Sequence, residues 1–284
     1  MSETALSKKG TEDIVILRPS RGWSALNLGD LWRYRELVFF LTWRDILVRY
    51  KQTVLGAGWA ILQPLINMVV LSVIFGSFAK MSTGGIPRPI FTFAALLPWG
   101  LFSKALSDAG RSILANRSMI TKIYFPRLII PLSSVLGGVV DFGIQFLILI
   151  LMMVYYRILP TSAAWTLPLF TLLALTTALG FGMWLSALNA LYRDVGHILP
   201  VLTQLWLLIS PVGYSAQDVV PLQWQVVYAL NPMVGVVEGF RWALLGAAPP
   251  SPLVLAASIT ISLALLVSGM YYFRRMERIF ADVV

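Results

Sequence analysis

The chain has 284 residues, of which 58% are hydrophobic and 12% are charged. Because a soluble domain carries about a quarter charged residues, this composition excludes an ordinary soluble protein and indicates a membrane protein. Basic residues gathered on the cytoplasmic side of a membrane explain the net charge of +9, so we expect no nucleic-acid partner.

Residue counts also exclude several kinds of catalytic site. The chain has no cysteine, which rules out disulfides, thiol catalysis and zinc–thiolate sites. His197 is the only histidine, so no multi-histidine metal site and no Ser–His–Asp triad can form without it. We therefore expect no catalytic residue, metal site or cofactor-binding residue in this chain.

The N-terminal part of the chain is predicted to lie in the cytoplasm and on the membrane surface. Residues 1–30 are mostly polar, which argues against a cleaved signal peptide. Residues 31–51 predict an amphipathic helix in the cytoplasmic interface, with basic residues toward lipid phosphates. The apolar stripe of this helix consists of Trp32, Phe39, Trp43, Ile46 and Tyr50. The alternative is an ordinary amphipathic helix that packs on the bundle.

Residues 52–284 are predicted to form the transmembrane domain of an all-α membrane protein. A helix that crosses the hydrocarbon core needs about 20 mostly apolar residues. On this criterion we expect six spans, at about residues 59–79, 89–106, 128–156, 168–190, 198–214 and 253–273.

Asp141 is the only charged residue in the third predicted span. A lone carboxylate at this depth is costly, and its default interpretation is functional. Gln145 lies one turn further on, and Lys104 and Arg241 are the candidate cationic partners. We favour a structural polar contact over a proton relay or a substrate contact.

The distribution of basic residues predicts the orientation. With the N-terminus inside, 17 of the 22 Lys and Arg residues fall in inner segments and 4 in outer ones. This asymmetry follows the positive-inside rule and places both chain ends in the cytoplasm.

Residues 219–245, on the predicted outer side, are apolar but interrupted at Asn231-Pro232. Proline removes a backbone donor and clashes with the preceding turn, so we expect two short re-entrant helices between spans five and six. Glu238 and Arg241 lie three residues apart and are expected to pair. Asn231, Pro232, Glu238 and Arg241 are the candidate residues of an outer gate.

Four stretches of the sequence resemble a known family. They are WRDILVRYKQTVLGAGWAILQPL (43–65), NRSMITKIYFPRLIIPL (116–132), ALYRDVGHILPVLTQLWLLISPVGY (190–214) and ALNPMVGVVEGFRWALLG (229–246). In this order and spacing they resemble the permease subunit of ABC-type polysaccharide exporters, within the type-2 ABC permease superfamily. The resemblance implies export of a lipid-linked chain such as O-antigen, capsule or teichoic acid across the bacterial cytoplasmic (inner) membrane.

The resemblance also implies the partners. In such exporters two permease chains pair as a homodimer, and each docks a separate ATPase subunit. The sequence has no G-x-x-x-x-G-K-[ST] phosphate loop, so ATP and Mg are expected on the partner and no cofactor in this chain.

The inner loop at residues 107–127 is the expected contact with the ATPase. Asn116 is expected to cap a short helix, and Pro126 to end it before the third span. By resemblance this is the coupling helix that converts ATPase closure into permease movement. The candidate residues are Asn116, Arg117, Met119, Ile120, Lys122 and Tyr124. A solvated inner loop explains the charges equally well but not the apolar side chains.

The candidate substrate path follows the first and fifth predicted spans, which the resemblance places along the channel. Neutral polar groups and aromatic rings suit sugars, which offer hydroxyls and flat C–H faces. The candidate residues are Gln63, Asn67, Phe75, Phe78, Thr203, Trp206, Ser210 and Tyr214. The alternative is that these side chains hold helices together or lie in the interfacial aromatic belt.

Three alternative functions predict different sequence features. The same fold could serve as an ABC permease for a drug or a simple lipid. An ion-coupled secondary transporter would show internal repeats and several intramembrane charges. A membrane-embedded glycan enzyme would cluster acids, bases or metal ligands in one pocket, and the predicted spans offer none.

Overall fold

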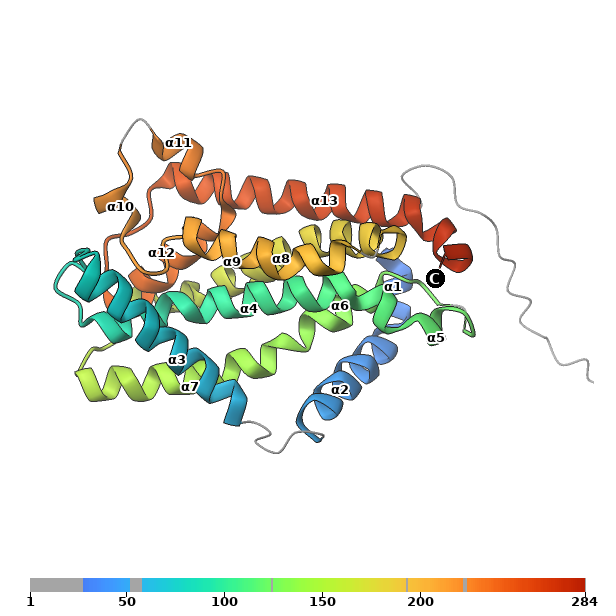
Figure 1. Cartoon of the computed structure of the whole chain (residues 1–284), viewed down its shortest axis with the longest axis horizontal. Helices are drawn as coiled ribbons and strands as arrows, with labels where there is room; N and C mark the ends of the chain where they lie inside the picture. Colours follow the sequence, from blue (N-terminus) through green and yellow to red (C-terminus); the bar gives the residue numbers. More distant parts are fainter. Residues whose placement is uncertain (1–27, 52–57, 124, 193, 222–223, 284) are drawn as a thin grey trace, which may run out of the picture.

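The computed structural model describes residues 28–51, 58–123, 125–192, 194–221 and 224–283 (Figure 1). Within these ranges every regular element is a helix, which confirms the all-α prediction. Most of the predicted N-terminal segment, and Tyr124, lie outside the described residues.

Five helical segments of the described chain are long and apolar enough to cross a membrane. They are Gly58–Phe78 (α3, Gly58–Val73, with the π-helical turn Ile74–Phe78), Arg88–Ala115 (α4), Ile129–Tyr156 (α6, Ile129–Leu136, and α7, Gly138–Tyr156), Ser162–Leu191 (the 3-10 turn Ser162–Thr166 and α8, Leu167–Leu191) and Pro252–Glu277 (within α13, Pro252–Val283). The predicted fifth span is the shorter apolar helix α9, Val195–Ile209.

Helix α4 is the centre of the bundle. In its most apolar stretch 78% of the residues are buried, whereas the corresponding value for α3 is 6%. Helix α8 packs against α4 on one side and against α13 on the other. The second span was expected to end at Leu106, but α4 continues to Ala115, and no proline between Leu106 and Asn116 interrupts it.

The two expected outer half-helices are only partly present. The second is α12, Pro232–Leu245, which begins at the predicted break with Pro232 in its first turn. The first is not one helix, because only the single turns α10, Ala216–Val219, and α11, Gln225–Tyr228, form there. Pro221 lies between these turns and disfavours a helical conformation at the residue before it.

The N-terminal helices α1, Leu28–Arg33, and α2, Arg35–Lys51, lie at the same end of the bundle as α5, Arg117–Ile120, and the C-terminal end of α13 (Figure 1). We call this the α5 end. Helix α2 buries Leu41 against the bundle and leaves the aromatic residues Phe39 and Trp43 exposed. Trp32, Phe39 and Trp43 of the expected apolar stripe therefore face outward, as lipid-facing side chains would, whereas Tyr50 of the same stripe is partly buried.

Helices α8 and α13 cross at glycines. A methyl group on Gly180 would lie 2.5 Å from the backbone nitrogen of Leu266, and one on Gly269 would overlap the carbonyl of Gly180. Small residues at such crossings let two helix backbones approach closely.

We expect Gly180→Ala to destabilise the protein, because the added methyl group forces the α8 and α13 backbones apart. The cost of such overpacking is about 1–3 kcal/mol. The thermal midpoint of the purified protein in detergent measures it. Gly143→Ala on α7 is the matched control, since a methyl group there has no atom within 4 Å; equal midpoints for the two variants would contradict the prediction.

Candidate functional site

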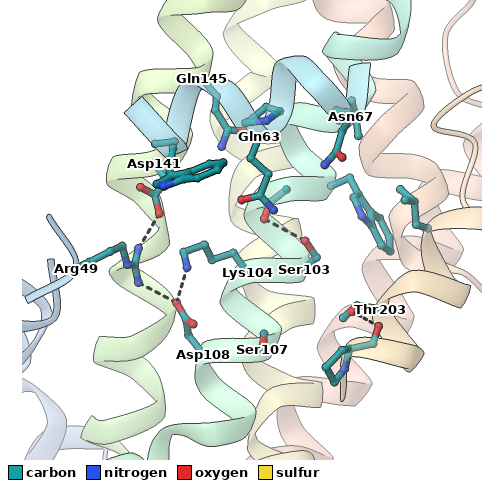
Figure 2. A pocket seen from close by; sticks show the side chains of 18 of the residues that line it. Arg49, Gln63, Asn67, Ser103, Lys104, Ser107, Asp108, Asp141, Gln145 and Thr203 are labelled. Atoms are coloured by element: carbon teal, nitrogen blue, oxygen red, sulfur yellow. Dashed lines mark hydrogen bonds and ion pairs between the residues drawn. The ribbon is translucent and has the colours of Figure 1, made fainter. Parts of the chain in front are cut away.

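A cavity of about 580 Å³ lies between α2, α3, α4, α7 and α9 (Figure 2). Most of its lining side chains carry hydrogen-bonding groups, which is unusual within a bundle of apolar spans. Its polar and charged lining residues are Arg49, Tyr50, Gln63, Asn67, Ser103, Lys104, Ser107, Asp108, Arg111, Asp141, Gln145 and Thr203. Trp59 and Trp99 add aromatic surface to the same cavity.

Helical spacing explains why these side chains converge. Residues four apart on a helix share one face, so Gln63 and Asn67 on α3 enter the cavity together. The same rule aligns Ser103, Ser107 and Arg111 along α4. The part of α4 past Leu106 thus contributes Ser107, Asp108 and Arg111 to the cavity.

An ion-pair network closes one wall of the cavity. Arg49 of α2 donates through Nη1 to Asp141 Oδ2 at 2.6 Å and through Nη2 to Asp108 Oδ2 at 2.9 Å. Lys104 Nζ lies 3.5 Å from the same Asp108 oxygen. Figure 2 shows Arg49 between the two carboxylates. One guanidinium thus joins α2 to both α4 and α7.

Asp141 has its partners on the predicted interface helix and not on another span. Besides Arg49, the Tyr50 hydroxyl donates to its other carboxylate oxygen. Burial and this hydrogen bond raise the pKa of Tyr50 to about 12, so the hydroxyl remains a donor at physiological pH. Neither Lys104 nor Arg241 pairs with Asp141. A carboxylate held in this way supports the interpretation as a structural polar contact.

The basic residues of α2 also depart from the expected orientation. Arg44 donates through Nη2 to Asp45 and to Asn116 Oδ1, each at 2.7 Å. Arg44 and Arg49 therefore point to the bundle, not to lipid phosphates. Charge-assisted bonds to Asn116, Asp108 and Asp141 hold these two guanidinium groups against the bundle.

The predicted substrate-path residues separate into two groups. Gln63, Asn67 and Thr203 line the cavity together. Five others do not line it, namely Phe75, Phe78, Trp206, Ser210 and Tyr214. Phe78 is 80% exposed, and the Phe75 ring lies 6.0 Å from that of Tyr214.

Asn231 connects the end of α9 with the start of α12. Its Oδ1 accepts from the Met233 backbone N–H at 3.1 Å and from the Trp206 indole N–H at 2.9 Å. Its Nδ2 donates to Ser210 Oγ at 3.0 Å. The structure thus brings Trp206 and Ser210 of the predicted path together with Asn231 of the predicted gate.

Arg241 does not form the expected pair with Glu238. Its guanidinium donates to the backbone carbonyls of four residues and lies over the Phe91 ring, 3.6 Å from its centre. These carbonyls belong to Phe91, Pro211, Val212 and Tyr214, at 3.2, 2.6, 2.6 and 2.9 Å. Three of them follow the end of α9, where carbonyls lack helical partners. Glu238 lines a cavity of about 300 Å³ with Gln217 and Tyr228, and it shares a smaller pocket of about 30 Å³ with Arg241.

The predicted coupling residues lie around α5. Arg117 and Lys122 are exposed, whereas Ile120 is 6% exposed and packs in the chain's own core. Ile123, 61% exposed, is the apolar side chain that faces outward beside them. Asn116 does not cap α5 as expected, because its side chain bonds Arg44 and the Ser112 carbonyl.

Sequence reasoning missed Arg49, Asp108 and Arg111 as residues of the cavity. Arg49 was placed on the membrane surface, and the other two in the inner loop. The available signal was the spacing of Lys104, Asp108 and Arg111, which share one face of a helix if the second span continues.

Among the described residues, no group of three or more His, Cys, Asp or Glu side chains could hold a metal ion. The cavity offers neutral hydrogen-bonding groups, three basic and two acidic side chains, and two indole rings. Such a lining suits a large polar ligand that is held weakly rather than a reaction centre.

Comparison with known proteins defines the class. Residues 36–245 match the model of the ABC-2 type transporter family, and the chain belongs to that family.

The chain is also similar to individual bacterial transport proteins. The chain is 29% identical over 252 residues to the O-antigen export system permease protein RfbA of Myxococcus xanthus, which covers 87% of this chain and 96% of the relative. It is 26% identical over 260 residues to a protein of the same name from Klebsiella pneumoniae, covering 91% and 97%. The polysialic acid transport protein KpsM of Escherichia coli is 25% identical over 213 residues, covering 71% and 78%.

Proposed function

We propose that this chain is the permease subunit through which a lipid-linked polysaccharide such as O-antigen is exported, driven by ATP hydrolysis on a separate subunit. The observation that carries the proposal is the match to O-antigen export permeases over 96% and 97% of their lengths. The residues of the chain do not bind ATP in this proposal; ATP and Mg belong to the partner.

The chemistry of the cavity supports a glycan. Sugars present hydroxyls to the amides and hydroxyls of Gln63, Asn67 and Thr203, and apolar C–H faces to Trp59 and Trp99. These groups exchange hydrogen bonds with sugars and with water alike, so binding stays weak enough for passage.

The proposed arrangement in the membrane has six spans. Helix α9 is the sixth span beside the five longer ones. Helix α12 re-enters from the outer side together with the turns α10 and α11. The α5 end faces the cytoplasm, as the positive-inside rule requires, and the membrane is the bacterial cytoplasmic (inner) membrane.

Two copies of the chain and two copies of the ATPase make up the proposed complex. Helices α3 and α9 carry rows of exposed apolar side chains, including Ile66, Val70, Val201 and Leu205. Because both helices also line the polar cavity, a second copy placed there would enclose the path between the two chains.

The other functions have less support. An ion-coupled transporter needs intramembrane charges that change partners, whereas Asp141 is held by two donors. A drug or lipid permease of the same family would have a more apolar path than this cavity.

The test is charge reversal at the coupling segment, residues 116–123. We expect Arg117→Glu with Lys122→Glu to weaken docking of the co-expressed cognate ATPase and to abolish surface polysaccharide in a strain that lacks the native gene. The reason is that both side chains are exposed beside α5, where like charge would repel an acidic groove. Co-purification stoichiometry and surface-glycan staining measure the two effects.

Arg157→Glu is the matched control, because Arg157 is an exposed arginine at the opposite end of the bundle. Unchanged docking and export in the Arg117 and Lys122 double variant would refute the coupling assignment. Normal surface polysaccharide in the deletion strain would refute the export function itself.

A further inference from the structure

Besides the bond from the Thr42 hydroxyl to the Ser133 carbonyl at 3.3 Å, helix α2 bonds to the bundle through arginines at two separate places. One is beside the coupling segment, where Arg44 donates to Asn116 Oδ1 at 2.7 Å. The other is at the polar cavity, where Arg49 donates to Asp141 and Asp108 at 2.6 and 2.9 Å. Both contacts are long-range, since the bonded residues lie far apart in the chain.

The first contact is fixed from both sides. Asn116 ends α4 and directly precedes α5, and its Nδ2 donates to the Ser112 carbonyl at 3.0 Å. This bond aims the amide oxygen at Arg44. Asp45 accepts from Arg44 Nε and Nη2 at 3.0 and 2.7 Å, which holds the guanidinium in place. A displacement of α5 therefore displaces the acceptor of Arg44.

The second contact lies where the lining of the cavity is partly exposed. We call this side of the cavity, lined by Arg49, Ser107 and Asp108, its mouth. Asp108 belongs to α4 and Asp141 to α7, so Arg49 holds two walls of the cavity at one point. Its Nη1 also donates to the Gly137 carbonyl at 3.3 Å. Loss of this guanidinium would leave Asp108 with Lys104 and Asp141 with Tyr50, and no charged group would then join the two walls.

The segment between the two contacts is rigid. Helix α2 runs from Arg35 to Lys51 without proline or glycine. Residues 44 and 49 lie about 7.5 Å apart along such a helix, so a shift at one is delivered to the other with little loss.

We propose that α2 is a lever that transmits movement of the coupling segment to the mouth of the cavity, with Arg44, Asn116, Arg49 and Asp141 as its positioning residues. The proposal rests on the proposed function, because the movement at α5 is that of a docked ATPase. The bond of Arg44 to Asn116 is the input of the lever, where movement of α5 reaches α2. The bonds of Arg49 to Asp108 and Asp141 are its output, where α2 acts on the cavity. Asp141 is thereby a structural contact with a mechanical consequence.

A purely structural role predicts something different. If these bonds only stabilise the fold, their loss lowers the stability equally in every nucleotide state. If α2 is a lever, their loss removes the dependence of the cavity on nucleotide. The measurement must therefore compare nucleotide states and not only stabilities.

The test uses a single introduced cysteine, since the chain has none of its own. Ser107 lines the cavity and is partly exposed, so Ser107→Cys reports access to the mouth (Figure 2). The full complex with its ATPase is placed in inside-out vesicles and labelled with a membrane-impermeant maleimide, without nucleotide and after trapping with ATP and vanadate. We expect the two labelling rates to differ by roughly 2- to 30-fold.

Two classes of variant separate input from output. Arg44→Gln and Asn116→Ala are expected to make the two labelling rates equal, with a ratio of about 1. ATP hydrolysis is expected to continue in Arg44→Gln, and Arg44→Lys, which keeps a donor, is expected to restore part of the difference. Arg49→Gln and Asp141→Asn are expected to give the faster rate in both states, and their double variant to add nothing further.

Lys51→Gln is the matched control. It removes a positive charge from the same turn of α2 as Arg49, but the Lys51 side chain is exposed. The lever is refuted if the parent shows one rate in both states, or if Arg44→Gln keeps the full difference. These results leave the proposed function intact as long as the ATPase docks and polysaccharide reaches the surface. A complex that does not form would refute both.

Discussion

Replacing Arg241 by methionine is expected to prevent the protein from reaching a stable folded state. The guanidinium is 2% exposed and satisfies four backbone carbonyls, three of them in the turn that follows α9. Each buried carbonyl left without a donor costs about 1–3 kcal/mol, and four of them approach the whole stability of a typical domain, about 5–15 kcal/mol. Yield and monodispersity of the detergent-solubilised protein measure this effect.

Arg241→Lys separates charge from geometry. Lysine keeps the positive charge but lacks the planar fork that reaches several acceptors at once. We therefore expect an intermediate thermal midpoint rather than rescue. Arg157→Met is the control, because the Arg157 side chain is exposed and its removal leaves no buried carbonyl without a donor. A methionine variant at Arg241 with normal yield and midpoint would disprove the argument.

The spans were predictable because lipid imposes a local rule on sequence. A helix that crosses a membrane must be apolar over its whole length, so composition alone locates α3, α4, α8 and α13. The end of α4 was not predictable in this way, since the charges of Asp108 and Arg111 interrupt the apolar run. They continue the helix instead, because the cavity gives their charges polar surroundings.

Long-range partners were the other limit of the sequence. Spacing suggested that Arg241 would pair with Glu238, three residues away, but three carbonyls exposed by the end of α9 take its donors. Asp141 likewise finds Arg49, 92 positions away in the chain. Local periodicity gives the face on which a charge lies; it does not give the atoms that the fold brings to that face.

Asn231 illustrates how one residue type can serve local and distant partners together. Its place before Pro232 identified it as a helix start, and the structure confirms the cap to the Met233 N–H. The contacts with Trp206 and Ser210 depend on the position of α9 and had no local signal. The bonds to Trp206 and Ser210 link the predicted path to the predicted gate, as does the bond from Arg241 to the Tyr214 carbonyl.

Asn231→Ala is therefore expected to release α12 from α9. Loss of the cap costs about 0.5–2 kcal/mol, and loss of each further bond about 0.5–1.5 kcal/mol. The summed loss of about 1.5–5 kcal/mol should lower the thermal midpoint strongly and reduce export of surface polysaccharide. Differential scanning fluorimetry in detergent and surface-glycan staining measure the two effects.

A graded series shows which bond matters. Asn231→Asp keeps the oxygen that accepts from Met233 and Trp206 but loses the donor to Ser210, so it should be the mildest variant. Trp206→Phe removes the indole donor together with part of the ring, and it keeps an aromatic ring beside Phe102, whose ring centre lies 4.9 Å from that of Trp206. If Asn231 acts through all three bonds, the midpoint falls least for Asn231→Asp and most for Asn231→Ala. Equal midpoints for Asn231→Asp and Asn231→Ala would show instead that the bond to Ser210 alone holds α12 in place.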